Sequence, residues 1–370
     1  MSQENEDYFL IINHNLYLEA KENGLIRTQK NVIQLYLSSP KKSGNKVKTD
    51  KASAKLLTNR PHRPIIGLKR LVGWCRRYLK WTKFAAQFKK NVKTNNIKLI
   101  YTVWLGGVWS WPLKKCLGIK LIHSYNDSSL ISLSKNIFRI FDSEYWVLKH
   151  CDRIDFLSAG IVPRLEKILG KIDQKRILIT PNSFILYENY FPEYPKENKV
   201  VFLARLTKIK NPILYLQAIV LFNHKYPQLK CDFYVLGSGS ENSSIKDYIS
   251  RNSLDNVFFE GAVYRPWEYL RRSKVFVSLQ RDENYPSQSI LEAMACENAI
   301  VVTDVGETRK LVTENEGVLV DFNPEQIADA FRYLLENEEI RLEMGKKARI
   351  KAMAEHNIEK FTEYFYSITS

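Results

Sequence analysis

Cysteine is scarce in this chain. Its 370 residues include five cysteines, which are widely separated and form no Cys-x-x-Cys pair. An odd number with this spacing argues against a disulfide framework and a zinc site, and favours a reducing compartment. Glycine and proline are also few, 15 and 13 residues, which excludes collagen-like and low-complexity chains. The composition indicates a globular protein of mixed α and β structure, and the length predicts two domains.

Long apolar runs are missing too. The longest uncharged stretch, Leu99 to Leu113, has 15 residues and contains two glycines and a proline, short of the ~20 apolar residues that a spanning helix needs. The first residues, MSQENEDYFLII, are acidic where an export signal is basic. We therefore expect no spanning segment and no export signal, and a cytoplasmic location.

Acidic residues are absent from one long region. Residues 51–100 carry 14 Lys and Arg and no Asp or Glu. Residues 1–190 hold 33 basic against 14 acidic side chains, giving +19, and residues 191–370 hold 23 against 26, giving −3. The first half therefore carries all of the net positive charge of +16. We expect its basic side chains to face phosphates, anionic lipid or bulk water.

Part of this basic region is periodic. Over residues 64–90, apolar side chains recur at helical spacing and predict an amphipathic helix, with basic side chains outside the stripe and aromatic rings among them. Rings mixed with cations suit the headgroup boundary of an anionic membrane, so one interpretation is peripheral attachment to the inner face of the cell membrane. The alternative is a domain helix with a solvated basic face. No nucleic-acid-binding motif accompanies the charge, so we expect no specific nucleic acid partner.

Strand-like and helix-like segments alternate along the second half, which predicts βαβ units and a parallel sheet. The first half follows the same pattern, with strands expected near residues 9–13, 32–37, 99–103, 121–124 and 154–158. The fold class is therefore α/β, with two Rossmann-like, doubly wound domains. We place the first domain at residues 1–190, the second at 191–350, and a C-terminal helix at 351–370 that packs back on the first domain. The Pro-containing segment 191–198 is the expected linker.

Ligands of open α/β sheets bind beyond the carboxyl ends of the strands. Several side chains with suitable chemistry follow strands of the second domain. Arg205 and Lys210 flank the start of a helix and make a candidate anion site. Two glycines let a backbone come close to a ligand, and a tyrosine after the next strand could stack on a base; these segments are Gly237, Ser238 and Gly239, then Val263 and Tyr264.

The segment after the next expected strand holds two carboxylates. Glu283 lies in a loop and Glu292 on the following helix, where carboxylates can accept hydrogen bonds from sugar hydroxyls. The loop between them also offers backbone NH groups at the helix start, and contains Asn284, Tyr285, Pro286 and Ser287. A capping box between Ser289 and Glu292 is the structural alternative for Glu292. A nucleotide sugar offers both phosphates and hydroxyls to such a site.

These residues resemble the GT-B glycosyltransferases, in particular glycosyltransferase family 4. The resemblance covers about residues 178–335 and depends on Pro181-Asn182-Ser183, on Gly261-Ala262-Val263, on the segments above, and on ENYPSQSILEAMACENAIVVTDVGETRKLV. It implies two domains facing each other across a cleft. It also implies that Arg205 and Lys210 bind the donor diphosphate, that Glu292 binds the ribose, and that Glu283 with the loop to Ser287 meets the donor sugar.

The sequence departs from the family pattern at the glutamate pair. The family has seven residues between the two glutamates, which would place the first at Asn284, whereas eight separate Glu283 from Glu292. The sugar-facing role therefore stays open between Glu283 and Asn284. On the acceptor side, the resemblance suggests a histidine after a central strand of the first domain. His123 is our candidate, with a structural histidine at a strand end as the alternative.

The resemblance implies a retaining transferase that moves a sugar from a nucleotide-diphosphate sugar to a glycan or lipid-linked acceptor, in bacterial surface polysaccharide or lipopolysaccharide assembly. We expect no cofactor and no metal, since no Asp-x-Asp is present and Arg205 with Lys210 can supply the positive charge. Two other classes stay open. One is an epimerase or phosphorylase with the same donor site, and the other is a non-catalytic protein that binds membrane or nucleic acid.

Overall fold

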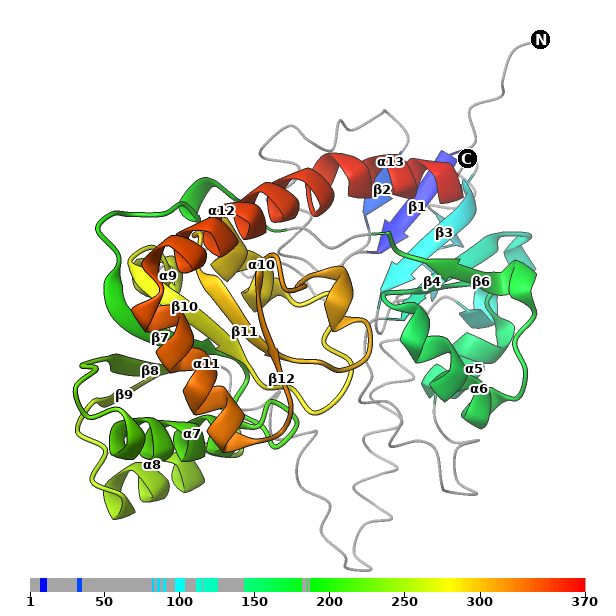
Figure 1. Cartoon of the computed structure of the whole chain (residues 1–370). Coiled ribbons are helices and arrows are strands. Elements are labelled where there is room, and N and C mark those ends of the chain that lie inside the picture. The colour runs from blue at the N-terminus through cyan, green and yellow to red at the C-terminus, as the bar shows by residue number, and fades with distance from the viewer. Residues whose placement is uncertain are drawn as a thin grey trace, which may run out of the picture.

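The computed structural model describes two parallel sheets that follow one another along the chain (Figure 1). The described residues are 7–11, 32–34, 82, 85, 86, 89, 90, 97–103, 111–114, 116–125, 143–181, 185 and 187–369. Most of the amphipathic helix predicted at 64–90 lies outside them, and its five described positions are helical. Each sheet has six strands, so the α/β fold class with two doubly wound domains is confirmed.

The first sheet has the strand order β2-β1-β3-β4-β5-β6. Its strands have three to seven residues, and all neighbouring strands run parallel. The bounds are β1 (Asp7–Ile11), β2 (Val32–Gln34), β3 (Ile97–Val103), β4 (Lys120–Tyr125), α5 (Ser143–His150), β5 (Arg153–Phe156), α6 (Val162–Leu169) and β6 (Ile177–Ile179). A short 3-10 helix, η3 (Ala159–Ile161), leads from β5 into α6.

The second sheet has the order β12-β11-β10-β7-β8-β9 and is also parallel throughout. Helices alternate with its strands: β7 (Glu197–Leu203), α7 (Pro212–Lys225), β8 (Asp232–Leu236), α8 (Asn242–Arg251), β9 (Val257–Gly261), α9 (Trp267–Leu270), β10 (Ser273–Ser278), α10 (Gln288–Ala295), β11 (Ala299–Thr303), β12 (Gly317–Val320), α11 (Pro324–Glu336) and α12 (Glu338–Glu355). None of the helices in the described part of the chain is long and apolar enough to cross a bilayer.

Both faces of the second sheet are buried, because successive strand residues point to opposite sides. On β7, Val200 and Phe202 enter one core with α7 and α11, and Val201 enters the other with α10 and α12. This double burial explains why the strands are continuous apolar runs in the sequence. It also leaves the strand ends as the place where polar side chains can reach solvent or a ligand.

The order of the second sheet reverses at one point. The chain moves from β7 outward to β8 and β9, and then returns to place β10 on the other side of β7. The helices that follow β7 and β10 therefore pack on opposite faces of the sheet, and folds with such a reversal bind ligands at this point. Arg205 and Lys210 follow β7, and Glu283 follows β10.

The last helix, α13 (Ile358–Thr369), returns to the first sheet (Figure 1). Its apolar side chains pack on a face of that sheet formed by Leu99, Tyr101 and Ile122. The Tyr364 hydroxyl also donates to Asp155 Oδ1 at 2.5 Å. Asp155 is buried and accepts two further hydroxyl hydrogen bonds. Burial raises the pKa of this carboxyl, and the hydroxyl donors oppose that rise.

Two local predictions were wrong. The position of ETRKLV (residues 307–312) between two strand-like segments predicts a helix, but only a three-residue 3-10 turn forms there, η6 (Thr308–Lys310). A six-residue segment holds less than two helical turns, and such short pieces often adopt the tighter 3-10 geometry. Strand β6 was not predicted, because three apolar residues after a basic segment give little periodicity.

Replacing Tyr364 with phenylalanine tests the attachment of α13. The change removes one donor to a buried carboxyl, so we expect a loss of about 1–3 kcal/mol in the free energy of unfolding of this region. Hydrogen exchange of the α13 amides should accelerate accordingly. Ser367→Ala is the control, since that exposed hydroxyl bonds only to the helix carbonyl of Tyr364 among the described contacts. Equal exchange in both variants would contradict the role of the Asp155 contact.

Candidate active site

Two cations follow β7, as the sequence predicts. Arg205 is exposed, and Lys210 is largely enclosed just before α7. Burial and, to a smaller extent, the positive charge of Arg205 together lower the pKa of Lys210 to about 8. The Lys210 ammonium donates to the side-chain oxygen of Gln280, which is neutral. The charge of Lys210 is therefore not cancelled by this partner and remains available to an anion.

The glycines after β8 hold the loop of Arg205. A Cβ on Gly237 would overlap the carbonyl oxygen of Ala204, and one on Gly239 would overlap that of Leu206. Between them, the Ser238 carbonyl accepts from the amide of Leu206 at 3.0 Å. The two glycines are thus required for the close approach of the β7 and β8 loops.

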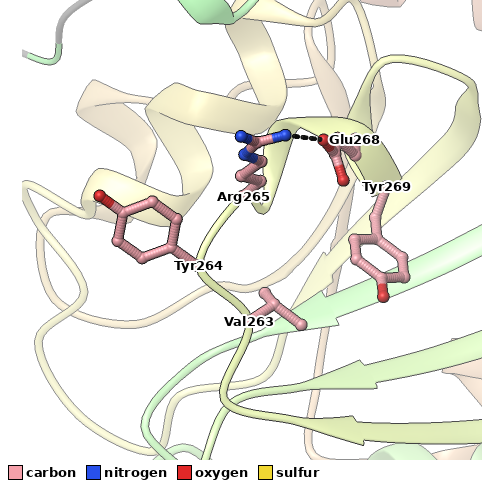
Figure 2. A pocket seen from close by; sticks show the side chains of 5 residues that line it. All are labelled: Val263, Tyr264, Arg265, Glu268 and Tyr269. Atoms are coloured by element: carbon pink, nitrogen blue, oxygen red, sulfur yellow. Dashed lines mark hydrogen bonds and ion pairs between the residues drawn. The ribbon is translucent and has the colours of Figure 1, made fainter. Parts of the chain in front are cut away.

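The segment after β9 borders a shallow hollow of about 260 Å³ (Figure 2). Val263 and Tyr264 lie on one side of it, and an ion pair between Arg265 and Glu268, 3.2 Å long, lies on another. The Tyr264 ring is 91% exposed and points away from Tyr269. An uncovered ring and nearby backbone groups are compatible with the predicted contact to a nucleotide base.

The carboxylate of Glu283 is enclosed between the two domains. Its Oε1 accepts hydrogen bonds from the amides of Tyr285, at 3.2 Å, and Glu307, at 2.9 Å. Its Oε2 is buried and has no hydrogen-bond partner among the described residues. A Cβ added to Gly160 of the first domain or Gly306 of the second would lie 2.5 Å from this oxygen. Two glycines therefore make room for the carboxylate.

The remaining loop residues make contacts on both sides of the domain boundary. The Asn284 side chain donates to the hydroxyl of Ser278 in β10 at 3.1 Å, and its own oxygen is buried. The Tyr285 hydroxyl donates to the carbonyl of Pro181 at 3.2 Å. Pro286 follows it through a cis peptide bond. Ser287 occupies the N-cap position of α10, but its hydroxyl makes no capping hydrogen bond.

Glu292 lies one turn into α10 and is largely enclosed. Burial raises its pKa to about 7, and a hydrogen bond with the Tyr190 side chain partly opposes the rise. Glu292 therefore bonds to Tyr190, whereas a capping box would have paired it with Ser289. A carboxylate held in this way is poorly solvated, so donors from a ligand would stabilise its ionised form.

His123 is fully buried in β4. Its Nδ1 lies 2.9 Å from the hydroxyl of Thr102, and its Nε2 is buried without a partner in the described part of the chain. Burial lowers its pKa to about 4, so the ring is neutral near pH 7. Its role toward an acceptor stays a prediction.

The sequence did not identify the contacts that join the domains here. The Ser158 hydroxyl donates to the carboxylate of Glu307, and Arg164 forms an ion pair with Asp282. Burial would raise the pKa of Glu307, but hydrogen bonds from Lys310 and Ser158 lower it overall. Of the residues in these contacts, only Glu307, next to Gly306, lies in the sequence segment that carries the family resemblance.

The second domain holds cations, close glycine loops and buried carboxylates at the carboxyl edge of a doubly wound sheet, an arrangement suited to a phosphorylated, hydroxyl-bearing ligand. Residues 187–351 match the family described as Glycosyl transferases group 1. Membership in glycosyltransferase family 4 stays a prediction.

Relatives and solved structures agree with this assignment. The chain is 24% identical over 230 residues to poly(ribitol-phosphate) alpha-N-acetylglucosaminyltransferase of Staphylococcus aureus (61% of this chain, 46% of the relative). It is 28% identical over 194 residues to N,N'-diacetylbacillosaminyl-diphospho-undecaprenol alpha-1,3-N-acetylgalactosaminyltransferase of Campylobacter jejuni (49% and 51%). The matches thus span about half the length of these relatives.

Alr3699/HepE of Anabaena, solved with UDP and glucose, superposes with a TM-score of 0.72 at 14% identity over 99% of this chain and 100% of that one. The GT-B fold is therefore confirmed.

The raised pKa of Glu292 predicts a pH-dependent gain in stability for Glu292→Gln. Ionising this buried carboxyl opposes folding, so its cost is small at pH 4.5, grows as the pH rises to about 7, and is constant above that. We expect the variant to be more stable than the wild type by roughly 2–3 kcal/mol at pH 8 and nearly equal at pH 4.5. Thermal unfolding at both pH values measures the difference.

Glu339→Gln is the matched control, because Glu339 is an exposed glutamate on α12. It should leave the melting temperature nearly unchanged at both pH values. A gain for Glu292→Gln of the same size at pH 4.5 and pH 8 would show that burial of the charge is not its cause.

Proposed function

We propose that this protein is a glycosyltransferase that moves a sugar from a nucleotide-diphosphate sugar to a hydroxyl of a glycan or lipid-linked acceptor. The observation that carries the proposal is that the second domain holds both a desolvated cation, Lys210 in the loop after β7, and a desolvated carboxyl, Glu292 on α10. A nucleotide-diphosphate sugar satisfies both, because its phosphates are anionic and its ribose hydroxyls donate hydrogen bonds.

The similarities support the same reaction class. Two relatives are named as transferases that act on poly(ribitol-phosphate) and on a diphospho-undecaprenol glycan, and a protein of the same fold binds UDP and glucose. By analogy, we propose a role in bacterial surface polysaccharide or lipopolysaccharide assembly, with membership in glycosyltransferase family 4.

In the proposed mechanism, the bond between the sugar and the diphosphate breaks and negative charge grows on the leaving phosphate. Arg205 and Lys210 stabilise that charge, which lowers the barrier because the charge is larger in the transition state than in the bound donor. These two cations supply the charge without a metal ion. The acceptor hydroxyl attacks from the face that the leaving group vacates and passes its proton to the leaving phosphate oxygen, with retention and no covalent enzyme intermediate.

The roles of the other residues follow from their places. Glu292 binds the ribose, and Tyr264 with Val263 faces the base at the hollow beyond β9. The backbone around Gly237 and Gly239 approaches the donor. Glu283 meets the donor sugar through the oxygen that lacks a partner in the described structure. His123 is proposed for the acceptor side.

We further propose peripheral binding to the inner face of the cell membrane through the basic, aromatic segment 64–90. The excess charge of the first half, +19 over residues 1–190, supports this, because each Lys or Arg near an anionic surface contributes about 1 kcal/mol. The full chain should sediment with vesicles that contain anionic lipid at low salt, and should be released at 0.5 M salt. Equal sedimentation with neutral vesicles would contradict an electrostatic attachment.

Calorimetric titration with UDP, GDP, ADP and CMP tests the donor site. We expect one nucleotide to bind selectively, and Glu292→Ala to weaken that binding about tenfold or more, since a hydrogen bond to a charged group contributes about 1.5–3 kcal/mol. Failure of the wild type to bind any of the four would contradict the proposed donor class.

Arg205→Ala serves as a second variant in the same titration. It removes a phosphate cation and leaves the ribose site intact, so it should reduce the preference for the nucleoside diphosphate over the monophosphate of the same base. Glu292→Ala should weaken both by similar factors. This contrast separates phosphate binding from ribose binding.

A further inference from the structure

Gln280 occupies the junction of three loops in the second domain. It lies two residues beyond the end of β10 and is 6% exposed. Its carbonyl oxygen accepts a hydrogen bond of 2.7 Å from the hydroxyl of Thr303, at the end of β11. The backbone of Gln280 is therefore fixed against one neighbouring strand, and the side chain is directed to the loop that follows the other, β7.

The side chain of Gln280 makes two hydrogen bonds of opposite kind. Its Oε1 accepts from the ammonium of Lys210, and its Nε2 donates to the carbonyl oxygen of Glu283. The amide orientation follows from chemistry, because an ammonium can only donate and a carbonyl can only accept. A glutamate could serve only the first contact and a lysine only the second, so a primary amide is the side chain that satisfies both.

The next residue strengthens the same link. The amide of Arg281 donates to the carbonyl of Ile209 at 2.8 Å, and its guanidinium donates to Asn211 Oδ1 at 3.0 Å. Asn211 has a φ of 59°, in the left-handed region, which asparagine adopts more readily than most residues with a side chain. The backbone on both sides of Lys210 is thus held by the segment that begins at Gln280.

We propose that Gln280 is a positioning residue that ties the diphosphate-binding cation Lys210 to the sugar-facing residue Glu283. The inference rests on the proposed function and extends it to a residue outside the catalytic and donor-binding set. A neutral acceptor orients the ammonium without cancelling its charge, whereas a carboxylate at this place would compete with the phosphates of the donor. One amide thereby sets the distance between the phosphate and sugar positions.

Gln280→Glu is the main test, because it keeps the shape and the acceptor, adds a negative charge, and removes the donor to Glu283. In protein labelled with [13C]lysine, the Cε resonance of Lys210 can be assigned by its loss in Lys210→Arg. We expect a titration midpoint near 8 in the wild type, where Arg205 is the neighbouring charge that acts on Lys210. In Gln280→Glu the midpoint should rise by about 1–3 pH units.

Nucleotide affinity provides the functional measurement. For the nucleoside diphosphate that the wild type selects among UDP, GDP, ADP and CMP, Gln280→Glu should bind about tenfold more weakly, since its carboxylate neutralises Lys210. Gln280→Met, which is similar in volume, should also weaken binding but should not raise the midpoint. Gln217→Glu adds the same charge on the exposed face of α7 and should change affinity less than twofold.

The outcomes separate the two proposals. An unchanged Lys210 midpoint in Gln280→Glu overturns the contact, whatever the protein binds. A raised midpoint with unchanged diphosphate affinity, in a protein whose wild type binds the nucleotide, overturns the positioning role alone. Absence of nucleotide binding by the wild type overturns the proposed function and this role with it, and the NMR titration then still reports whether the contact exists.

Discussion

The carboxylate of Glu283 lies between two glycines of different domains, and neither glycine can carry a side chain while it does. A Cβ on Gly160 or on Gly306 would come within 2.5 Å of Oε2, closer than non-bonded atoms approach. The carboxyl group of Glu283 therefore lies at the contact between the first domain and the second. Because the amide of Glu307 donates to the same group, and the Glu307 side chain accepts from Ser158, the position of Glu283 and the approach of the domains depend on each other.

Burial of charged groups at this edge of the second sheet opposes folding. Lys210 and Glu292 have pKa values displaced toward their neutral forms, to about 8 and about 7, and both displacements arise mainly from burial. An enclosed polar group without a full set of partners costs about 1–3 kcal/mol. Such costs are typical of sites whose partners arrive with a ligand, since groups already desolvated and oriented need little rearrangement when it binds. The apolar cores on both faces of the sheet supply the stability that offsets them.

The sequence predicts most strands because their apolar runs are buried on both faces. The five strands expected in the first half correspond to β1 to β5 within a few residues. Contacts between distant loops were not predictable. No recognisable motif links Gln280 to Lys210. The two residues are 70 positions apart and meet only because β10 lies beside β7. Whether Glu283 or Asn284 meets the donor sugar was left open for another reason, because eight residues separate Glu283 from Glu292 where the family has seven.

The contacts that hold the domains together around Glu283 are few and polar. Arg164 with Asp282, Ser158 with Glu307, and Tyr285 with Pro181 join the domains there, and a partly exposed ion pair such as Arg164 with Asp282 contributes only about 0–1 kcal/mol. By contrast, α13 is anchored on the first sheet through an apolar face and the buried Asp155. The chain thus passes between domains twice, before β7 and between α12 and α13. Among the described contacts, the apolar face and the buried carboxyl that hold α13 therefore join the domains more strongly than the partly exposed ion pair beside Glu283.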